Sequence, residues 1–323
     1  MLRKENSMTR QCDKVYGQIK LTITLLIGLG ISIMACISPQ QSAQEGQIEV
    51  NGIEIHYRTI GSGDPVFVLS GGPGDALETM RPFEALSDEY QLILYDQRAA
   101  GRSTGDADTA THDLDHFVED LESLRLKLAP QKINIIGGSW GCTVALHYAF
   151  KYPQNVNALI LTSPMGVSSD YFAVYRANIA ANRTTEDSLA IEQIAATEDF
   201  ARRRPETVEK FWRHYFRAYC YDPSYADSID LWYRDTTYEI VEGRYNRVWE
   251  FFGGYDITDS LKLVTCPTLI LYGDYDPTPF DFVQPINDGI VGSRLVRFER
   301  AGHWLWVEAT DRVIPVVRGF LKE

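Results

Sequence analysis

The chain has 323 residues, of which 45% are hydrophobic and 23% charged, so it is long enough to bury a full core and has an ordinary globular composition. Its formal net charge at pH 7 is −13, because 44 Asp and Glu outnumber 31 Lys and Arg. An acidic surface argues against nucleic acid and against anionic lipid as partners. We therefore expect neither as a partner.

The N-terminal segment has the layout of an export signal. Basic residues are spread over the first twenty positions, and an uncharged run follows over residues 21–37. This run contains Ile33-Met34-Ala35-Cys36, which resembles a bacterial lipobox, the motif whose cysteine is acylated. We therefore expect residues 1–35 to be a lipoprotein signal peptide and Cys36 to be the lipidated residue.

This assignment predicts where in the cell the protein lies and how it is attached there. Residues 36–47 are polar and small, which suits a flexible tether between the lipid and the folded part. We expect an exported protein held at the cell envelope by acyl chains, in the outer membrane where the organism has one. The alternative is an uncleaved membrane anchor, since the apolar run is close to the shortest length that spans a bilayer.

Short apolar runs and helical patterns alternate over residues 48–163. The alternating residues around Asn51-Gly52 predict a β-hairpin over 48–57, because Asn-Gly favours a two-residue turn. Leucine and phenylalanine at helical spacing predict an amphipathic helix over 113–129. Further strands are predicted at 65–69, 92–95, 133–136 and 158–162, and a further helix at 142–152.

The pattern changes after Ser163-Pro164. Residues 164–258 lack β-branched runs and are helical, charged and aromatic, and strands return only at 268–272 and 295–298, before a last helix at 312–321. A helical insertion between strands of a parallel sheet is typical of a cap over a site. We therefore predict an α/β fold, a mostly parallel sheet covered by helices on both faces, with a core over 48–163 and 259–323 and a cap over 164–258.

The segment Gly137-Gly138-Ser139-Trp140-Gly141 lies between a predicted strand and a predicted helix. This is the G-x-S-x-G pattern of a sharp turn that presents a serine hydroxyl at the top of a sheet. Glycines are needed there because the serine occupies strained backbone space and the strand and helix lie close together. The pattern predicts Ser139 as a nucleophile.

A serine nucleophile needs a base and an orienting carboxylate. His303 lies just past the last predicted strand, whereas the other histidines fall in the hairpin, on helices or at helix ends. Asp274 and Asp276 compete for the carboxylate position. We favour Asp276, which precedes Pro277 on the loop, and expect Asp274 to brace that loop. The chain order Ser139, Asp276, His303 is the one expected for this topology.

Two backbone N–H groups near the serine oxygen would complete an oxyanion hole. Trp140 supplies one by its position after Ser139, and Gly72 in Gly71-Gly72-Pro73-Gly74 supplies the other. The sequence has no HExxH, Walker or dinucleotide-binding pattern, so we expect neither a metal nor a cofactor.

Together these motifs resemble those of the α/β-hydrolase superfamily and, within it, of the proline iminopeptidase family. The resemblance covers residues 48–163 and 259–323, and it departs from the family pattern where Ser70 replaces a histidine and Ala99 a glycine. The motifs that carry it are Gly71-Gly72-Pro73-Gly74, residues 96–103, Gly137-Gly138-Ser139-Trp140-Gly141, residues 273–276 and Gly302-His303.

The resemblance implies a substrate and one further site residue. Enzymes of this family hold the free amino group of the substrate with cap glutamates, and Glu250 in Trp249-Glu250-Phe251 is similar to one such site. The alternative is that Glu250 is a solvated helix charge. No second glutamate matches, and Asp222 is only a weak substitute.

We therefore predict a serine hydrolase that releases an N-terminal residue, with proline favoured, from short peptides through an acyl-enzyme. The alternative enzyme is an esterase or amidase of small acyl substrates with the same triad, because a fold does not fix a substrate. From a different class, a non-catalytic surface-binding lipoprotein is the third hypothesis. The sequence predicts no oligomeric state.

Overall fold

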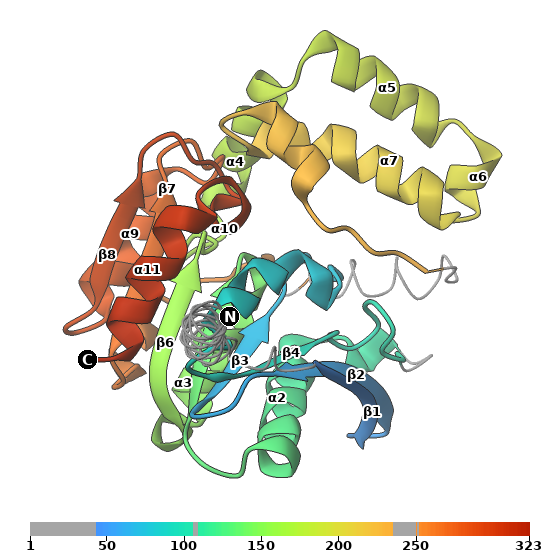
Figure 1. Ribbon diagram of the computed structural model, residues 1–323. Coiled ribbons are helices and arrows are strands. Elements are labelled where there is room, and N and C mark those ends of the chain that lie inside the picture. Colours follow the sequence, from blue (N-terminus) through green and yellow to red (C-terminus); the bar gives the residue numbers. More distant parts are fainter. Residues whose placement is uncertain (1–42, 106–108, 235–249, 251) are drawn as a thin grey trace, which may run out of the picture. The chain divides into compact units, whose positions relative to one another are not determined.

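A sheet of eight strands runs through the computed structural model, which describes residues 43–105, 109–234, 250 and 252–323 (Figure 1). The strands lie in the order β1-β2-β4-β3-β5-β6-β7-β8, with antiparallel pairing of β1 with β2 and of β2 with β4 and parallel pairing elsewhere. Their bounds are β1 Gln44–Val50, β2 Ile53–Ile60, β3 Pro65–Leu69, β4 Gln91–Tyr95, β5 Ile133–Gly138, β6 Val156–Thr162, β7 Thr268–Gly273 and β8 Arg294–Phe298. The predicted mostly parallel α/β sheet is confirmed.

The first hairpin is longer than the sequence predicted. β1 begins at Gln44, which pairs with Thr59, so residues 44–47 belong to the sheet and not to the tether predicted over 36–47. The reason is the turn at Asn51-Gly52, where both residues have positive φ and fix the register of the two strands. The predicted leader, Cys36 and the first part of the tether lie outside the described residues.

Each face of the sheet packs against its own set of helices. Alternate strand residues such as Phe67, Ile93 and Ile135 share one buried cluster with α2 (Leu114–Leu128), α3 (Trp140–Lys151) and α9 (Phe280–Gly289). Their neighbours on the strands share the other cluster with the 3₁₀ segment η2 (Leu77–Leu86), α10 (Leu305–Glu308) and α11 (Thr310–Leu321). The sheet is therefore covered on both sides, as predicted.

The sequence did not predict η2 and α9. Each contains an internal proline, Pro82 in η2 and Pro285 in α9, which removes a backbone donor. Short 3₁₀ turns also occur at Thr109–Thr111, Pro153–Asn155 and Thr258–Leu263.

The described part of the segment between β6 and β7 contains several helices joined by loops. Figure 1 shows α5, α6 and α7 together at the upper right and α4 nearer the centre, all of them away from α2 and α3. An isolated antiparallel bridge between Ser168 and Asp256 joins the two ends of this insertion. The elements are α4 Tyr171–Asn182, α5 Thr185–Ala195, α6 Glu198–Ala201, α7 Pro205–Phe216, η5 Arg217–Tyr219 and η6 Pro223–Ser228.

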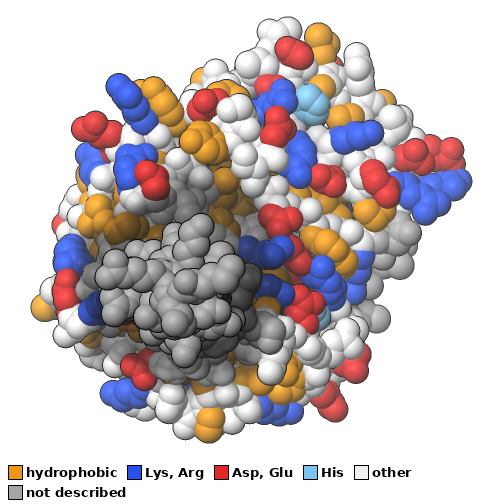
Figure 2. All heavy atoms as spheres, in the orientation of Figure 1, with side chains coloured by type: hydrophobic (Ala, Val, Ile, Leu, Met, Phe, Trp, Pro, Cys, Tyr) orange, Lys and Arg blue, Asp and Glu red, His pale blue; other side chains and the backbone are white. Residues whose placement is uncertain are grey.

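Acidic and basic side chains are interspersed on the visible surface of this helical segment, at the upper right of Figure 2. Within the part of the chain that the structure describes, no helix is both long enough and apolar enough to cross a bilayer.

The strand register brings several loops to one edge of the sheet. Leu69 pairs with both Tyr95 and Gly137, so β3, β4 and β5 end at the same level. Gly273 at the end of β7 likewise pairs with Phe298 at the end of β8. In open α/β sheets ligands bind beyond these carboxyl ends, so this edge is where a site is expected.

Candidate active site

Ser139 occupies the sharp turn between β5 and α3. Its φ of 51° and ψ of −116° lie in strained backbone space for a residue other than glycine. A Cβ on Gly137 would lie 2.6 Å from the carbonyl oxygen of Gly141, and a Cβ on Gly141 would lie 2.4 Å from that of Leu69. The glycines on either side of Ser139 are therefore required by the close approach of strand and helix.

Three side chains form a hydrogen-bonded chain at this edge. His303 Nε2 lies 2.9 Å from Ser139 Oγ, and His303 Nδ1 lies 2.8 Å from Asp276 Oδ2. Because a carboxylate only accepts, Nδ1 carries the proton and Nε2 is left to accept from the Ser139 hydroxyl. The Asp276 side chain is fully buried, and its other oxygen accepts from the backbone N–H of Thr278 at 2.7 Å.

The two aspartates of the loop after β7 have different partners. Asp276 meets His303, whereas Asp274 Oδ1 accepts a hydrogen bond from Arg297 Nε at 2.7 Å near the surface. Asp276 therefore orients His303, and Asp274 holds the loop against β8.

The glycine loop after β3 lies directly beside Ser139. A Cβ on Gly71 would lie 3.3 Å from Ser139 Cβ, and Gly72, with a φ of 106°, lines the cavity in front of the serine. Trp140 is the first residue of α3, where backbone N–H groups have no acceptor within the helix. The two N–H groups expected to form an oxyanion hole thus belong to segments that flank Ser139.

Gln97 connects these two segments, a role that the sequence analysis did not assign. Its Nε2 donates to the carbonyl oxygen of Ser70 at 2.7 Å, and its Oε1 accepts from Trp140 Nε1 at 3.1 Å. The one signal for this role is its position in the motif over residues 96–103. Gln97 is buried and fixes the glycine loop relative to the turn that carries Ser139.

The residues on either side of Gln97, Asp96 and Arg98, hold the loop after β4 in place. Asp96 is fully buried and accepts backbone hydrogen bonds from Leu77 at 2.7 Å and from Arg102 at 2.8 Å. Arg98 forms a buried two-point ion pair with Asp120 on α2. A buried pair of this kind needs both partners in place, so it fixes the position of the loop.

Glu308 ties the histidine loop to the helical segment. It accepts hydrogen bonds from the backbone N–H of Gly302 at 2.9 Å and of Tyr221 at 2.7 Å, and His303 N donates to the carbonyl of Tyr219 at 2.8 Å. Burial raises the pKa of the Glu308 carboxyl to about 7. The loop that carries His303 therefore depends on contacts with residues 219–221.

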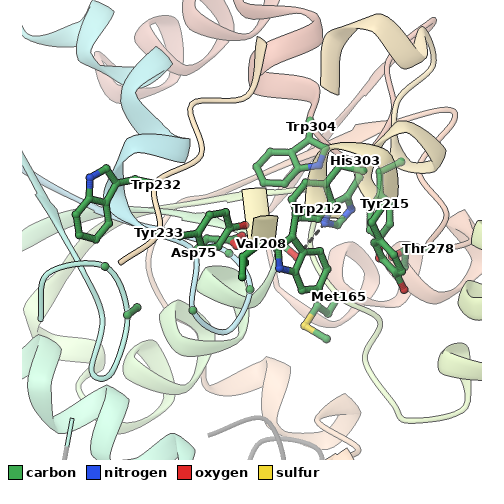
Figure 3. A pocket seen from close by; sticks show the side chains of 18 of the residues that line it. Asp75, Met165, Val208, Trp212, Tyr215, Trp232, Tyr233, Thr278, His303 and Trp304 are labelled. Atoms are coloured by element: carbon green, nitrogen blue, oxygen red, sulfur yellow. Dashed lines mark hydrogen bonds between the residues drawn. The ribbon is translucent and has the colours of Figure 1, made fainter. Parts of the chain in front are cut away.

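A cavity of about 260 Å³ opens onto Ser139 and His303. Figure 3 shows aromatic side chains around it, among them Trp212, Tyr215 and Trp232, in the same view as His303. Its volume is just below the roughly 300 to 1,000 Å³ that is typical for drug-sized ligands. The cavity suits a small, partly apolar ligand.

Glu250 does not line this cavity and is exposed. Residues 235–249 and 251 on either side of it lie outside the described residues. The role of Glu250 in binding substrate therefore stays a prediction, beside the alternative of a solvated charge. Cys36 also lies outside the described residues, and within those residues no group of three His, Cys, Asp or Glu side chains is arranged to hold a metal ion.

Known proteins resemble this chain over most of its length. Residues 64–310 match the family model of the alpha/beta hydrolase fold. A proline iminopeptidase from Saccharolobus solfataricus is 30% identical over 312 residues, which cover 87% of this chain and 93% of the relative.

Two solved structures share the fold. The proline iminopeptidase of Mycobacterium smegmatis has a TM-score of 0.64 at 20% identity and covers 86% of this chain and 98% of its own. An esterase from Exiguobacterium antarcticum has a TM-score of 0.61 at 24% identity, with coverage of 87% and 100%. At these identities the two structures show the fold alone.

Proposed function

Because the chain belongs to the α/β-hydrolase fold family and, within it, to the proline iminopeptidase family, we propose that it is a serine aminopeptidase that releases the N-terminal residue, with proline favoured, from short peptides. The observation that carries this proposal is the hydrogen-bonded chain of Ser139, His303 and Asp276 in front of an aromatic cavity. The aromatic lining suits the ring of proline.

In the proposed mechanism His303 Nε2 takes the proton of Ser139 Oγ while that oxygen attacks the scissile carbonyl carbon. The N–H groups of Gly72 and Trp140 stabilise the resulting oxyanion, each by about 3 kcal/mol of barrier. Asp276 orients the imidazole and stabilises its protonated form. His303 then gives the proton to the leaving amine, and a water molecule, activated by the same histidine, hydrolyses the acyl-enzyme. No metal or cofactor enters this mechanism.

The second candidate is an esterase or amidase of small acyl substrates. It is favoured by one observation, namely that Glu250, the glutamate expected to bind a substrate amine, is exposed and does not line the cavity. The esterase from Exiguobacterium antarcticum shows that this fold also supports ester hydrolysis. A non-catalytic role is disfavoured, because all three members of the hydrogen-bonded chain are present and in contact.

Export and lipidation at Cys36 are part of the proposal and are supported by the sequence of the N-terminal segment alone. In this proposal the acyl chains, rather than surface charge, attach the acidic protein to a membrane.

Replacing Ser139 by alanine tests the proposed mechanism. We expect Ser139→Ala to lower kcat by about 10⁶-fold, because the attacking oxygen is lost, and to abolish labelling by a fluorophosphonate. Ser188→Ala is the matched control, since its hydroxyl contacts only the carbonyl of Thr184 within its own helical turn. Turnover that survives in Ser139→Ala would show that another group performs the reaction.

A further inference from the structure

Asp75 follows the glycine loop and faces the cavity beside the proposed nucleophile (Figure 3). A Cβ on Gly71 would lie 3.1 Å from Asp75 Oδ2 and 3.3 Å from Ser139 Cβ, so the carboxylate and the serine side chain both approach Gly71. Ser70 Oγ donates to the backbone carbonyl of Asp75 at 2.8 Å, and Gln97 holds the carbonyl of Ser70. The backbone carbonyl of Asp75 is therefore held by Ser70, and Ser70 is itself held by Gln97.

Asp75 also differs in charge from the other charged residues of the cavity. Among the described residues that line it, Asp75 is the only one with a carboxylate, and Arg176, Arg203 and Arg234 contribute guanidinium groups. Burial lowers the pKa of Arg234, which indicates poor solvation on its side of the cavity. A cationic ligand is repelled by the arginines and attracted by Asp75.

The chemistry of an N-terminal residue sets where its amine must lie. The amine nitrogen is two bonds from the scissile carbonyl carbon, and that carbon must contact Ser139 Oγ in order to react. A group that binds the amine must therefore be adjacent to the serine. Asp75 meets this condition, whereas Glu250, exposed and outside the cavity lining, does not.

On this basis, and resting on the aminopeptidase function proposed above, we propose that Asp75 binds the free ammonium group of the peptide substrate. The ion pair places the scissile carbonyl on Ser139. An acyl substrate without an ammonium group does not form this ion pair. Asp75 therefore favours substrates with a free N-terminus over neutral acyl substrates.

The test compares the full-length protein with Asp75→Asn on two substrates, prolyl-2-naphthylamide and p-nitrophenyl acetate. Asparagine keeps the size of the side chain and removes its charge. We expect kcat/KM for the prolyl amide to fall by about 100-fold or more, and kcat/KM for the acetate ester to stay level or rise. Asp288→Asn is the matched control, because Asp288 is exposed on α9 and contacts Gln284.

The outcomes separate this inference from the proposed function. If the unsubstituted protein hydrolyses the ester and not the prolyl amide, the aminopeptidase function fails. If it cleaves the prolyl amide and Asp75→Asn cleaves it equally well, the function stands and the role of Asp75 is overturned.

Fluorophosphonate labelling of Ser139 reports whether the variant keeps its fold. A variant that labels normally but loses both substrates contradicts a role limited to the amine. Asp75→Glu, which keeps the charge, is expected to keep the preference for the free amine. If both variants fail to label, Asp75 is a structural residue of the loop and the inference is overturned.

Discussion

The backbone at Ser139 and at Ala99 is left-handed, with φ of 51° and 58°. At Ser139 the strained backbone presents the hydroxyl to His303, as in other sharp strand-to-helix turns. Where this chain has Ala99, the proline iminopeptidase motif has glycine, and glycine adopts this conformation without a steric penalty. Both residues line the cavity.

The sequence predicted some site residues well and others poorly, for physical reasons. Ser139, Asp276 and His303 were predictable as a set, because each follows a strand and the strands are parallel. The role of Glu250 stays a prediction that rests on its local sequence. The role proposed for Asp75 could not be predicted from the sequence, because it depends on how the glycine loop folds against Ser139.

The two aspartates after β7 provide a paired test at the residue scale. We expect Asp276→Asn to lower kcat by about 10⁴-fold, because an amide that donates to His303 Nδ1 holds the wrong tautomer. Asp274→Asn weakens only a hydrogen bond to Arg297 near the surface and should change kcat less than about twofold. Steady-state kinetics on the prolyl amide measure both variants. Equal losses in the two would contradict the assignment of Asp276.

The elements of the sheet were predicted more completely than the elements around it. Each predicted strand lies within an observed strand, because β-branched runs bounded by turns are a strong signal. The helices η2 and α9 were not predicted, and the start of β1 was missed because its first residues are polar. Pairing across a fixed hairpin turn, rather than hydrophobicity, makes those residues a strand.

Loops from several strands meet at the candidate site and are joined by buried side chains. Gln97, after β4, bridges the loop after β3 and the turn after β5. Glu308, on α10, bridges the loop after β8 and residue 221 of the helical segment. These links between elements cannot be read from periodicity, because each joins residues that are distant in the sequence.

The raised pKa of Glu308 predicts a pH dependence of stability. The folded protein keeps the Glu308 proton up to about pH 7, whereas the unfolded chain loses it near the ordinary value of 4.5. Between these values the folded state binds more protons, so this group makes the free energy of unfolding decrease as pH rises. The decrease is about 3 kcal/mol over that window.

Glu308→Gln removes this titration and should become more stable relative to the unsubstituted protein as pH rises from 5 to 7. Urea unfolding at pH 5, 6 and 7 measures the difference, with Glu299→Gln as an exposed control. Parallel pH dependence of Glu308→Gln and the unsubstituted protein would mean that Glu308 does not titrate in this range.

At the scale of the whole molecule, the charge of the protein and the charge of its cavity differ. The chain carries a formal net charge of −13, yet the described cavity lining has three arginines and one aspartate. Overall composition therefore argues against nucleic acid and anionic lipid as partners but gives no information about the substrate. That information lies in the arrangement of a glycine loop from the sheet and side chains from the helical segment.

We expect the protein to require a free amino group on its substrate. The most direct measurement compares hydrolysis of prolyl-2-naphthylamide and of its N-acetylated form by the full-length protein. We predict that the free-amine compound is cleaved at least about 100-fold more efficiently, because acetylation removes the charge that pairs with a cavity carboxylate. Equal cleavage of the two amides, or hydrolysis of p-nitrophenyl acetate without cleavage of either, would contradict the claim.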